Sequence, residues 1–87
     1  MKKWYADKME DRYGYIYKIF ANNVKKNRLK QSLSQEELAF KAGLHRTYIS
    51  DIEREKRSIS LGNIQKISIA LEIEPYELFL KEDAEND

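Results

Sequence analysis

The chain of 87 residues contains no cysteine and only one histidine, one proline and three glycines. Without cysteine it has no disulfide, thiolate zinc site or cysteine nucleophile, and this composition suits a reducing cytoplasm. With a single histidine, we expect no metal site and no cofactor. No apolar run approaches the roughly 20 residues of a membrane span, and the N-terminus lacks the apolar stretch of a secretory signal. We therefore expect a cytoplasmic protein that does not contact a membrane.

Residue types that enzymes combine in their active sites are scarce in the sequence. It offers no nucleophile with an adjacent base, no cluster of metal ligands and no glycine-rich loop for phosphate. With 41% hydrophobic and 36% charged residues, it has the composition of one small globular domain. We expect a binding protein rather than an enzyme.

The net charge of +1 conceals an uneven distribution of charge. Residues 1–30 hold nine Lys/Arg and three Asp/Glu, residues 31–60 five of each, and residues 61–87 two and seven. Electrostatic binding depends on the charge of the local face rather than on the sum. The distribution therefore allows a basic binding surface, although two solvated faces of opposite sign would give the same counts.

Apolar residues recur at intervals of three and four, which predicts helices, whereas the alternation typical of strands is absent. We expect an all-α fold whose five helices cover residues 13–31, 35–42, 46–54, 61–71 and 75–80. In the fourth helix one stripe is predicted to be buried: Leu61, Ile64, Ile67, Ser68 and Leu71.

The expected helix ends have characteristic residues. Ser34 and Glu37 have the spacing of a capping box, in which each side chain bonds a free backbone N–H. Gly43 suits the left-handed position that ends the second helix. His45 and Ser60 are expected N-caps, and Pro75 is expected in the first turn of the last helix. These signals place short helices on both sides of Gly43.

The segment 35–54 predicts a helix-turn-helix. Ala39 must be small because the second helix crosses it, and Gly43 must adopt a positive φ. Leu38, Ile49 and Ile52 are apolar where they would fill the angle between the two helices. An ordinary helical hairpin is the alternative, but it does not require agreement at all five positions.

With these motifs, the sequence resembles the lambda repressor/Cro-like helix-turn-helix family. The resemblance rests on residues 33–44 (LSQEELAFKAGL), 48–54 (YISDIER), 64–71 (IQKISIAL) and 75–79 (PYELF), and covers about residues 20–80. Within the family, the run GLHRTYIS at 43–50 is similar to the controller proteins of bacterial restriction–modification systems. This resemblance implies a compact five-helix lambda-repressor-like domain over residues 16–80. Residues 1–15 would form an N-terminal aromatic and basic extension, and residues 81–87 an acidic tail.

The resemblance implies sequence-specific binding to double-stranded DNA, with the first turn of the helix at 46–54 in the major groove. The residues expected to read bases are Arg46, Thr47, Ser50 and Asp51. Arg46 can bond guanine O6 and N7, and the Thr47 methyl can contact thymine. Ser50 can reach either a base or a phosphate. Asp51 can accept from cytosine or instead orient Arg46 or Arg54.

Other polar residues are expected to contact the DNA backbone, which positions the protein without reading sequence. They are Gln35, Tyr48, Arg54, Lys56, Arg57 and Asn63, with core packing as the alternative for Tyr48. Arg28 and Glu53 are implied to form a partly buried bridge between the first helix and the recognition helix rather than to bind DNA. For His45, an N-cap role is favoured over a metal or acid–base role.

One domain of this size reads few base pairs, so we expect a homodimer on a two-fold operator with half-sites roughly 34 Å apart. The expected dimer contact consists of Ile73, Tyr76, Leu78, Phe79 and Leu80. The function implied is transcriptional regulation of a restriction–modification operon. A phage-type repressor, an antitoxin and a protein-interaction module are the alternatives. Activation would require contact with RNA polymerase, for which Glu36 and Glu37 are candidates.

The sequence departs from the family in two places. Glu55 follows the recognition helix where the family usually has glycine, so the backbone there must be strained or capped differently. The N-terminal extension is rich in aromatics: Trp4, Tyr5, Tyr13, Tyr15 and Tyr17. We expect these to pack on the core or across a dimer, with a DNA-contacting arm led by Lys2 and Lys3 as the alternative.

Overall fold

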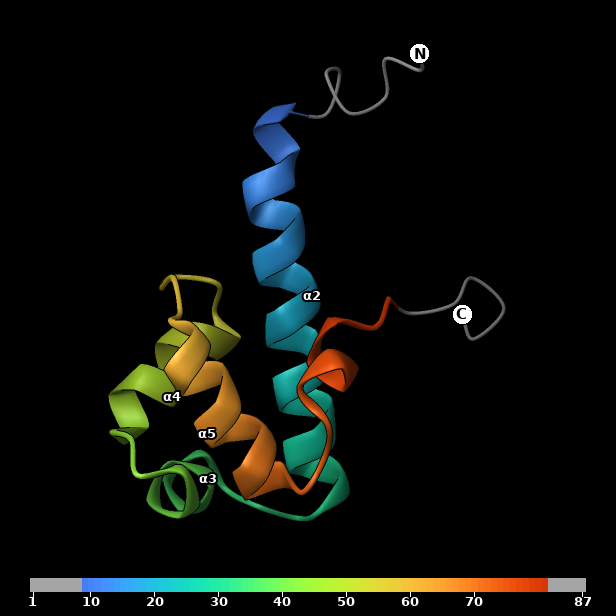
Figure 1. The fold of residues 1–87 in the computed structure, drawn as a ribbon. Coiled ribbons are helices and arrows are strands. Elements are labelled where there is room, and N and C mark those ends of the chain that lie inside the picture. The colour runs from blue at the N-terminus through green and yellow to red at the C-terminus, as the bar shows by residue number, and fades with distance from the viewer. Residues whose placement is uncertain (1–8, 82–87) are drawn as a thin grey trace.

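The computed structural model describes the backbone of residues 9–81 and the side chains of residues 15–81. In this part of the chain there are four α-helices and no strand: α2 (Met9–Lys30), α3 (Gln35–Ala42), α4 (Arg46–Glu53) and α5 (Leu61–Leu71). A 3₁₀ helix, η1 (Pro75–Phe79), follows. Figure 1 shows α2 as the long helix, with η1 packed on one side of it and α3, α4 and α5 on the other. The all-α expectation is confirmed for the described residues.

The prediction of five α-helices is wrong at its last element. Residues 75–79 form a 3₁₀ helix because a segment this short gains too few i→i−4 bonds to offset the cost of α-helix nucleation. The carbonyls at its end bond to α2 instead. The Asn23 side-chain amide donates to the Leu78 and Leu80 carbonyls at 3.1 and 2.8 Å. Asn23 therefore attaches the C-terminal segment to the first helix.

The core lies where α2, α3, α4, α5 and η1 meet. Its side chains with no exposed surface are Val24, Leu38, Ile49, Ile67, Leu71 and Leu78. Leu61 departs from the predicted buried stripe, with 84% of its surface exposed. As the first residue of α5, it precedes the turns that pack on the core. The remainder of the stripe is buried or half-buried.

The turn between α3 and α4 has the predicted geometry. Gly43 ends α3 with φ 70° and ψ 35°, and the Leu44 N–H donates to the Ala39 carbonyl at 2.9 Å. The capping box is also present: the Glu37 N–H donates to Ser34 Oγ at 2.9 Å, and the Ser34 N–H donates to Glu37 Oε1 at 2.7 Å. The Gly43 turn sets the angle at which α4 leaves α3, and the capping box fixes the start of α3.

Glu55 adopts the strained alternative. Its φ of 62° lies in the left-handed region that glycine enters without cost and other L-residues enter at a cost of roughly 1–2 kcal/mol. Its N–H donates to the Ile52 carbonyl, so the glutamate ends α4 in the conformation that glycine usually supplies.

The first helix begins at Met9, before the predicted start at Tyr13, and passes without interruption through the predicted boundary at residue 15. In Figure 1 its N-terminal turns extend beyond the other helices. Tyr15 is exposed and Tyr17 is half-buried, and the Lys81 ammonium lies 5.4 Å from the centre of the Tyr15 ring. Lys2, Lys3, Trp4, Tyr5, the Tyr13 side chain and the tail beyond Lys81 lie outside the described residues.

Candidate nucleic-acid interface

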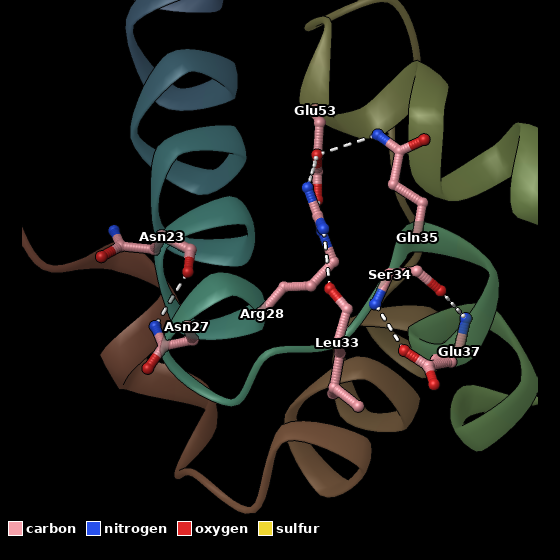
Figure 2. Close-up of polar contacts among 8 residues, drawn as sticks. All are labelled: Asn23, Asn27, Arg28, Leu33, Ser34, Gln35, Glu37 and Glu53. Carbon is pink, nitrogen blue, oxygen red and sulfur yellow. Dashed lines mark hydrogen bonds and ion pairs between the residues drawn. The ribbon is translucent and has the colours of Figure 1, made fainter.

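A buried ion pair joins α2 to the end of α4, as Figure 2 shows. Arg28 Nε donates to Glu53 Oε2 at 2.7 Å, and Nη2 donates to Oε1 at 2.9 Å. The third nitrogen, Nη1, donates to the Leu33 carbonyl at 2.8 Å. The two side chains are only 9% and 4% exposed. One guanidinium therefore holds both the end of the recognition helix and the turn that precedes α3.

Gln35 completes this cluster. Its side-chain Nε2 donates to Glu53 Oε1 at 3.0 Å, so the amide bonds within the protein rather than extending into solvent (Figure 2). As the first residue of α3, Gln35 also has a backbone N–H without an intrahelical acceptor. A phosphate contact from Gln35, as the sequence predicts, would use this backbone group.

The first turn of α4 is exposed on the side of the molecule away from η1 (Figure 1). Arg46 and Thr47, its first two residues, are exposed, and Ser50 is half-buried one turn later. Ser50 follows Arg46 by four residues and Thr47 by three, so the three share one face. His45 occupies the N-cap position without a side-chain hydrogen bond to the helix.

Asp51 is bonded to two arginines. Arg54 Nη2 donates to Oδ1 at 2.8 Å and Arg57 Nη2 to Oδ2 at 3.2 Å. These hydrogen bonds, first that of Arg54 and then that of Arg57, hold the pKa of the Asp51 carboxyl below its usual value. Because both oxygens are engaged, the geometry favours the second sequence-derived alternative for Asp51, the orientation of arginine. Its partners are Arg54 and Arg57, not Arg46.

Tyr48, Arg57 and Asn63 converge from three segments. The Arg57 guanidinium carbon lies 4.9 Å from the centre of the Tyr48 ring, and Asn63 Nδ2 donates to the Tyr48 hydroxyl at 2.9 Å. Tyr48 and Arg57 also line a surface pocket of about 360 Å³ with residues 43–45 and Thr47. Tyr48 packs against the core, as one of the two sequence-derived alternatives expects, and it also lines this surface pocket.

The remaining basic residues expected at the DNA backbone, Arg54 and Lys56, are exposed in the segment that follows α4. The Lys56 N–H donates to the Asp51 carbonyl at 2.8 Å, which holds this segment against the helix. Five of the residues expected at DNA therefore form one chain of contacts, in the order Arg54, Asp51, Arg57, Tyr48 and Asn63.

Of the five residues expected at the dimer contact, two are exposed, two are half-buried and one is buried. Leu78 is fully buried within one protomer, so its inclusion in the contact is wrong: it fills the core. Phe79 is half-buried, with its ring 5.3 Å from that of Phe20. Ile73 is also half-buried, whereas Tyr76 and Leu80 are exposed.

Ile69, which is 66% exposed in the last turn of α5, is an apolar surface residue that the sequence did not lead us to predict. The helical spacing in the sequence could have identified Ile69, because residue 69 falls outside the stripe formed by Ile64, Ile67 and Leu71. An isoleucine outside the core stripe of a short helix marks an apolar position that the protomer itself does not cover.

In the part of the chain that the structure describes, no group of three or more histidine, aspartate or glutamate side chains could hold a metal ion. None of the described helices is long and apolar enough to cross a membrane.

Comparison with known proteins identifies the family. A helix-turn-helix family model matches residues 24–78. Control protein C.BamHI of Bacillus amyloliquefaciens is 56% identical over 61 residues, which are 69% of this chain and 75% of that protein. The chain belongs to the helix-turn-helix family of restriction–modification control proteins. Control protein C.SmaI of Serratia marcescens is 38% identical over 83% of this chain and 86% of its own.

The fold agrees with that of a solved control protein. The crystal structure of the restriction-modification controller protein C.AhdI from Aeromonas hydrophila superposes with a TM-score of 0.71 at 46% identity. The match covers 72% of this chain and 96% of that one. Because the chain belongs to the control protein family, the controller function is favoured over the phage-type repressor, the antitoxin and the protein-interaction module.

The bridge between α2 and α4 gives a first prediction. Replacing Arg28 with methionine leaves the buried Glu53 carboxylate without its cation, and we expect the free energy of unfolding to fall by roughly 3–5 kcal/mol. Urea denaturation measures this loss. In the double variant Arg28→Met/Glu53→Met no charge is left buried, and most of the loss should be recovered. A loss below about 1 kcal/mol in the single variant would show that the pair does not hold the helices together.

Proposed function

We propose that this control protein binds a two-fold DNA operator as a homodimer and regulates transcription of a restriction–modification operon. The observation that carries the proposal is the exposed first turn of α4, on a helix whose other end is fixed by the buried Arg28–Glu53 pair. A rigid helix that presents polar side chains from its first turn is the element that helix-turn-helix proteins insert into the major groove.

Three residues of that turn have the chemistry for reading bases. The Arg46 guanidinium can donate two parallel hydrogen bonds to guanine O6 and N7. Thr47 offers a methyl group that can contact thymine and a hydroxyl that can bond a donor or an acceptor on a base edge. Ser50 lies on the same face one turn later. Asp51, bonded to Arg54 and Arg57, is assigned to orienting the backbone-binding arginines rather than to a base.

Backbone contacts would flank this turn. Arg54, Lys56 and Arg57 follow α4 and place positive charge beside it, and the N–H of Gln35 lies at the first turn of α3. Each phosphate that these side chains neutralise steepens the dependence of affinity on salt by about one logarithmic unit. Because the net charge is only +1, we expect weak binding to non-specific DNA. Base contacts should then contribute a large share of the affinity for the operator.

The dimer surface is proposed to combine the exposed Tyr76 and Leu80 with Ile69 of α5, around the half-buried Ile73 and Phe79. These side chains belong to α5 and to the segment that contains η1, and the two elements pack against each other. A second copy is the proposed occupant because half-sites one helical turn apart require two recognition helices related by a dyad. RNA polymerase is proposed as a further partner through Glu36 and Glu37, which are exposed on α3.

Replacing Arg46 with alanine tests base reading. We expect affinity for an operator duplex to fall by roughly 10- to 100-fold, the value of a bidentate contact to guanine, while the thermal midpoint of unfolding is unchanged. In Lys56→Ala, the matched control, operator and non-specific affinity should fall by the same factor. Fluorescence anisotropy with an operator duplex and with a non-specific duplex measures both affinities. Unchanged operator binding by Arg46→Ala would show that Arg46 does not read bases.

Replacing Ile69 with aspartate tests the dimer surface. A charge in an apolar contact is costly to desolvate, so we expect the dimer dissociation constant to rise at least tenfold in sedimentation equilibrium. Phe40→Asp is the matched control, since Phe40 is also an exposed apolar residue but lies on α3. A wild-type protein that remains monomeric at micromolar concentration, with and without operator DNA, would contradict the dimer.

A further inference from the structure

The side chain of Asn63 is hydrogen-bonded to another of the residues expected at the DNA backbone, Tyr48. Asn63 is half-buried in the first turn of α5, where its backbone N–H donates to Ser60 Oγ at 3.1 Å. That capping bond fixes the position of the residue. From there, Nδ2 extends to the Tyr48 hydroxyl on α4, 2.9 Å away.

The direction of this hydrogen bond determines what the Tyr48 hydroxyl can do. A phenol oxygen can accept one hydrogen bond and donate another. Since Asn63 is the donor here, the Tyr48 oxygen is the acceptor, and its own hydrogen is left for a different acceptor. The amide thus leaves the Tyr48 hydroxyl hydrogen available to another acceptor, and a donor of this kind can bind an anionic oxygen.

A cation is held over the ring of the same tyrosine. The Arg57 guanidinium lies over the Tyr48 ring at 4.9 Å and is bonded to Asp51 at 3.2 Å, so two contacts restrain it. Tyr48 and Arg57 line one side of the pocket of about 360 Å³, and Thr47 and residues 43–45 line the rest. An oriented hydroxyl donor and a restrained guanidinium at one pocket suit a phosphate oxygen of the DNA backbone.

We propose that Asn63 is a positioning residue that acts through Tyr48, orienting its hydroxyl as a donor to a DNA phosphate beside Arg57. The sequence predicts a different role, in which Asn63 contacts a phosphate independently. The proposal rests on the proposed function, since it concerns how the same interface holds DNA. It also implies that the contribution of Asn63 carries no sequence information, because it reaches DNA only through a backbone contact.

A double-mutant cycle distinguishes the two roles. Asn63→Ala removes the amide, Tyr48→Phe removes only the hydroxyl, and the double variant removes both. If Asn63 acts through Tyr48, each single variant should weaken DNA binding roughly three- to tenfold, and the double variant should be no weaker than Tyr48→Phe alone. Operator and non-specific duplexes should be affected equally, so the ratio of the two affinities stays at the wild-type value.

Controls separate this role from a structural one and from failure of the function. Asn22→Ala, at an exposed asparagine of α2, should bind as wild type, and thermal midpoints should agree across the set. Losses that multiply in the double variant would assign Asn63 an independent contact and overturn the proposal. Wild-type binding by Asn63→Ala, or a loss explained by a lowered thermal midpoint, would also overturn it. If the wild-type protein itself selects no DNA, the proposed function fails instead.

Discussion

The buried pair of Arg28 and Glu53 is the interaction on which the rest of the structure depends. Glu53 is the last residue of α4, where the negative end of the helix dipole disfavours a carboxylate. Arg28 offsets that cost with two hydrogen bonds and gives its third nitrogen to the Leu33 carbonyl ahead of α3. A buried ion pair contributes little net stability compared with an apolar replacement, but it specifies one arrangement of its partners. Here the arrangement is the angle of the recognition helix.

Fixing α4 at its C-terminal end leaves its N-terminal turn free to meet DNA. The two ends therefore have different tasks: Glu53 orients the helix, and Arg46 and Thr47 are exposed at the other end. Asp51 lies between them, and its bonds to Arg54 and Arg57 connect the helix to the basic segment that follows. Orientation of the helix and the proposed base reading and backbone binding thus fall largely within residues 46–57, and a shift of the helix would affect all three.

Local signals predicted the helical part of the fold well. The capping box at Ser34, the left-handed Gly43 and the apolar Leu38 and Ile49 each depend on near neighbours in the chain, and each is found in the structure. The errors arose at residues whose conformation or burial is determined by contacts with segments distant in the sequence. The Asn23 amide bonds the carbonyls around η1, and Leu78 is buried by α2 and α5 rather than left for a partner. Sequence periodicity cannot identify such long-range partners, nor could it show that Asn63 bonds Tyr48.

The central claim is that one recognition helix from each of two copies reads a dyad-symmetric DNA site. Selection of bound sequences from a pool of random duplex DNA tests it most directly, because it measures specificity and symmetry in one experiment. We expect enrichment of an inverted repeat with half-site centres about one helical turn apart, roughly 34 Å, and with guanine at the position facing Arg46. Enrichment of no sequence, or of a single asymmetric site, would contradict it.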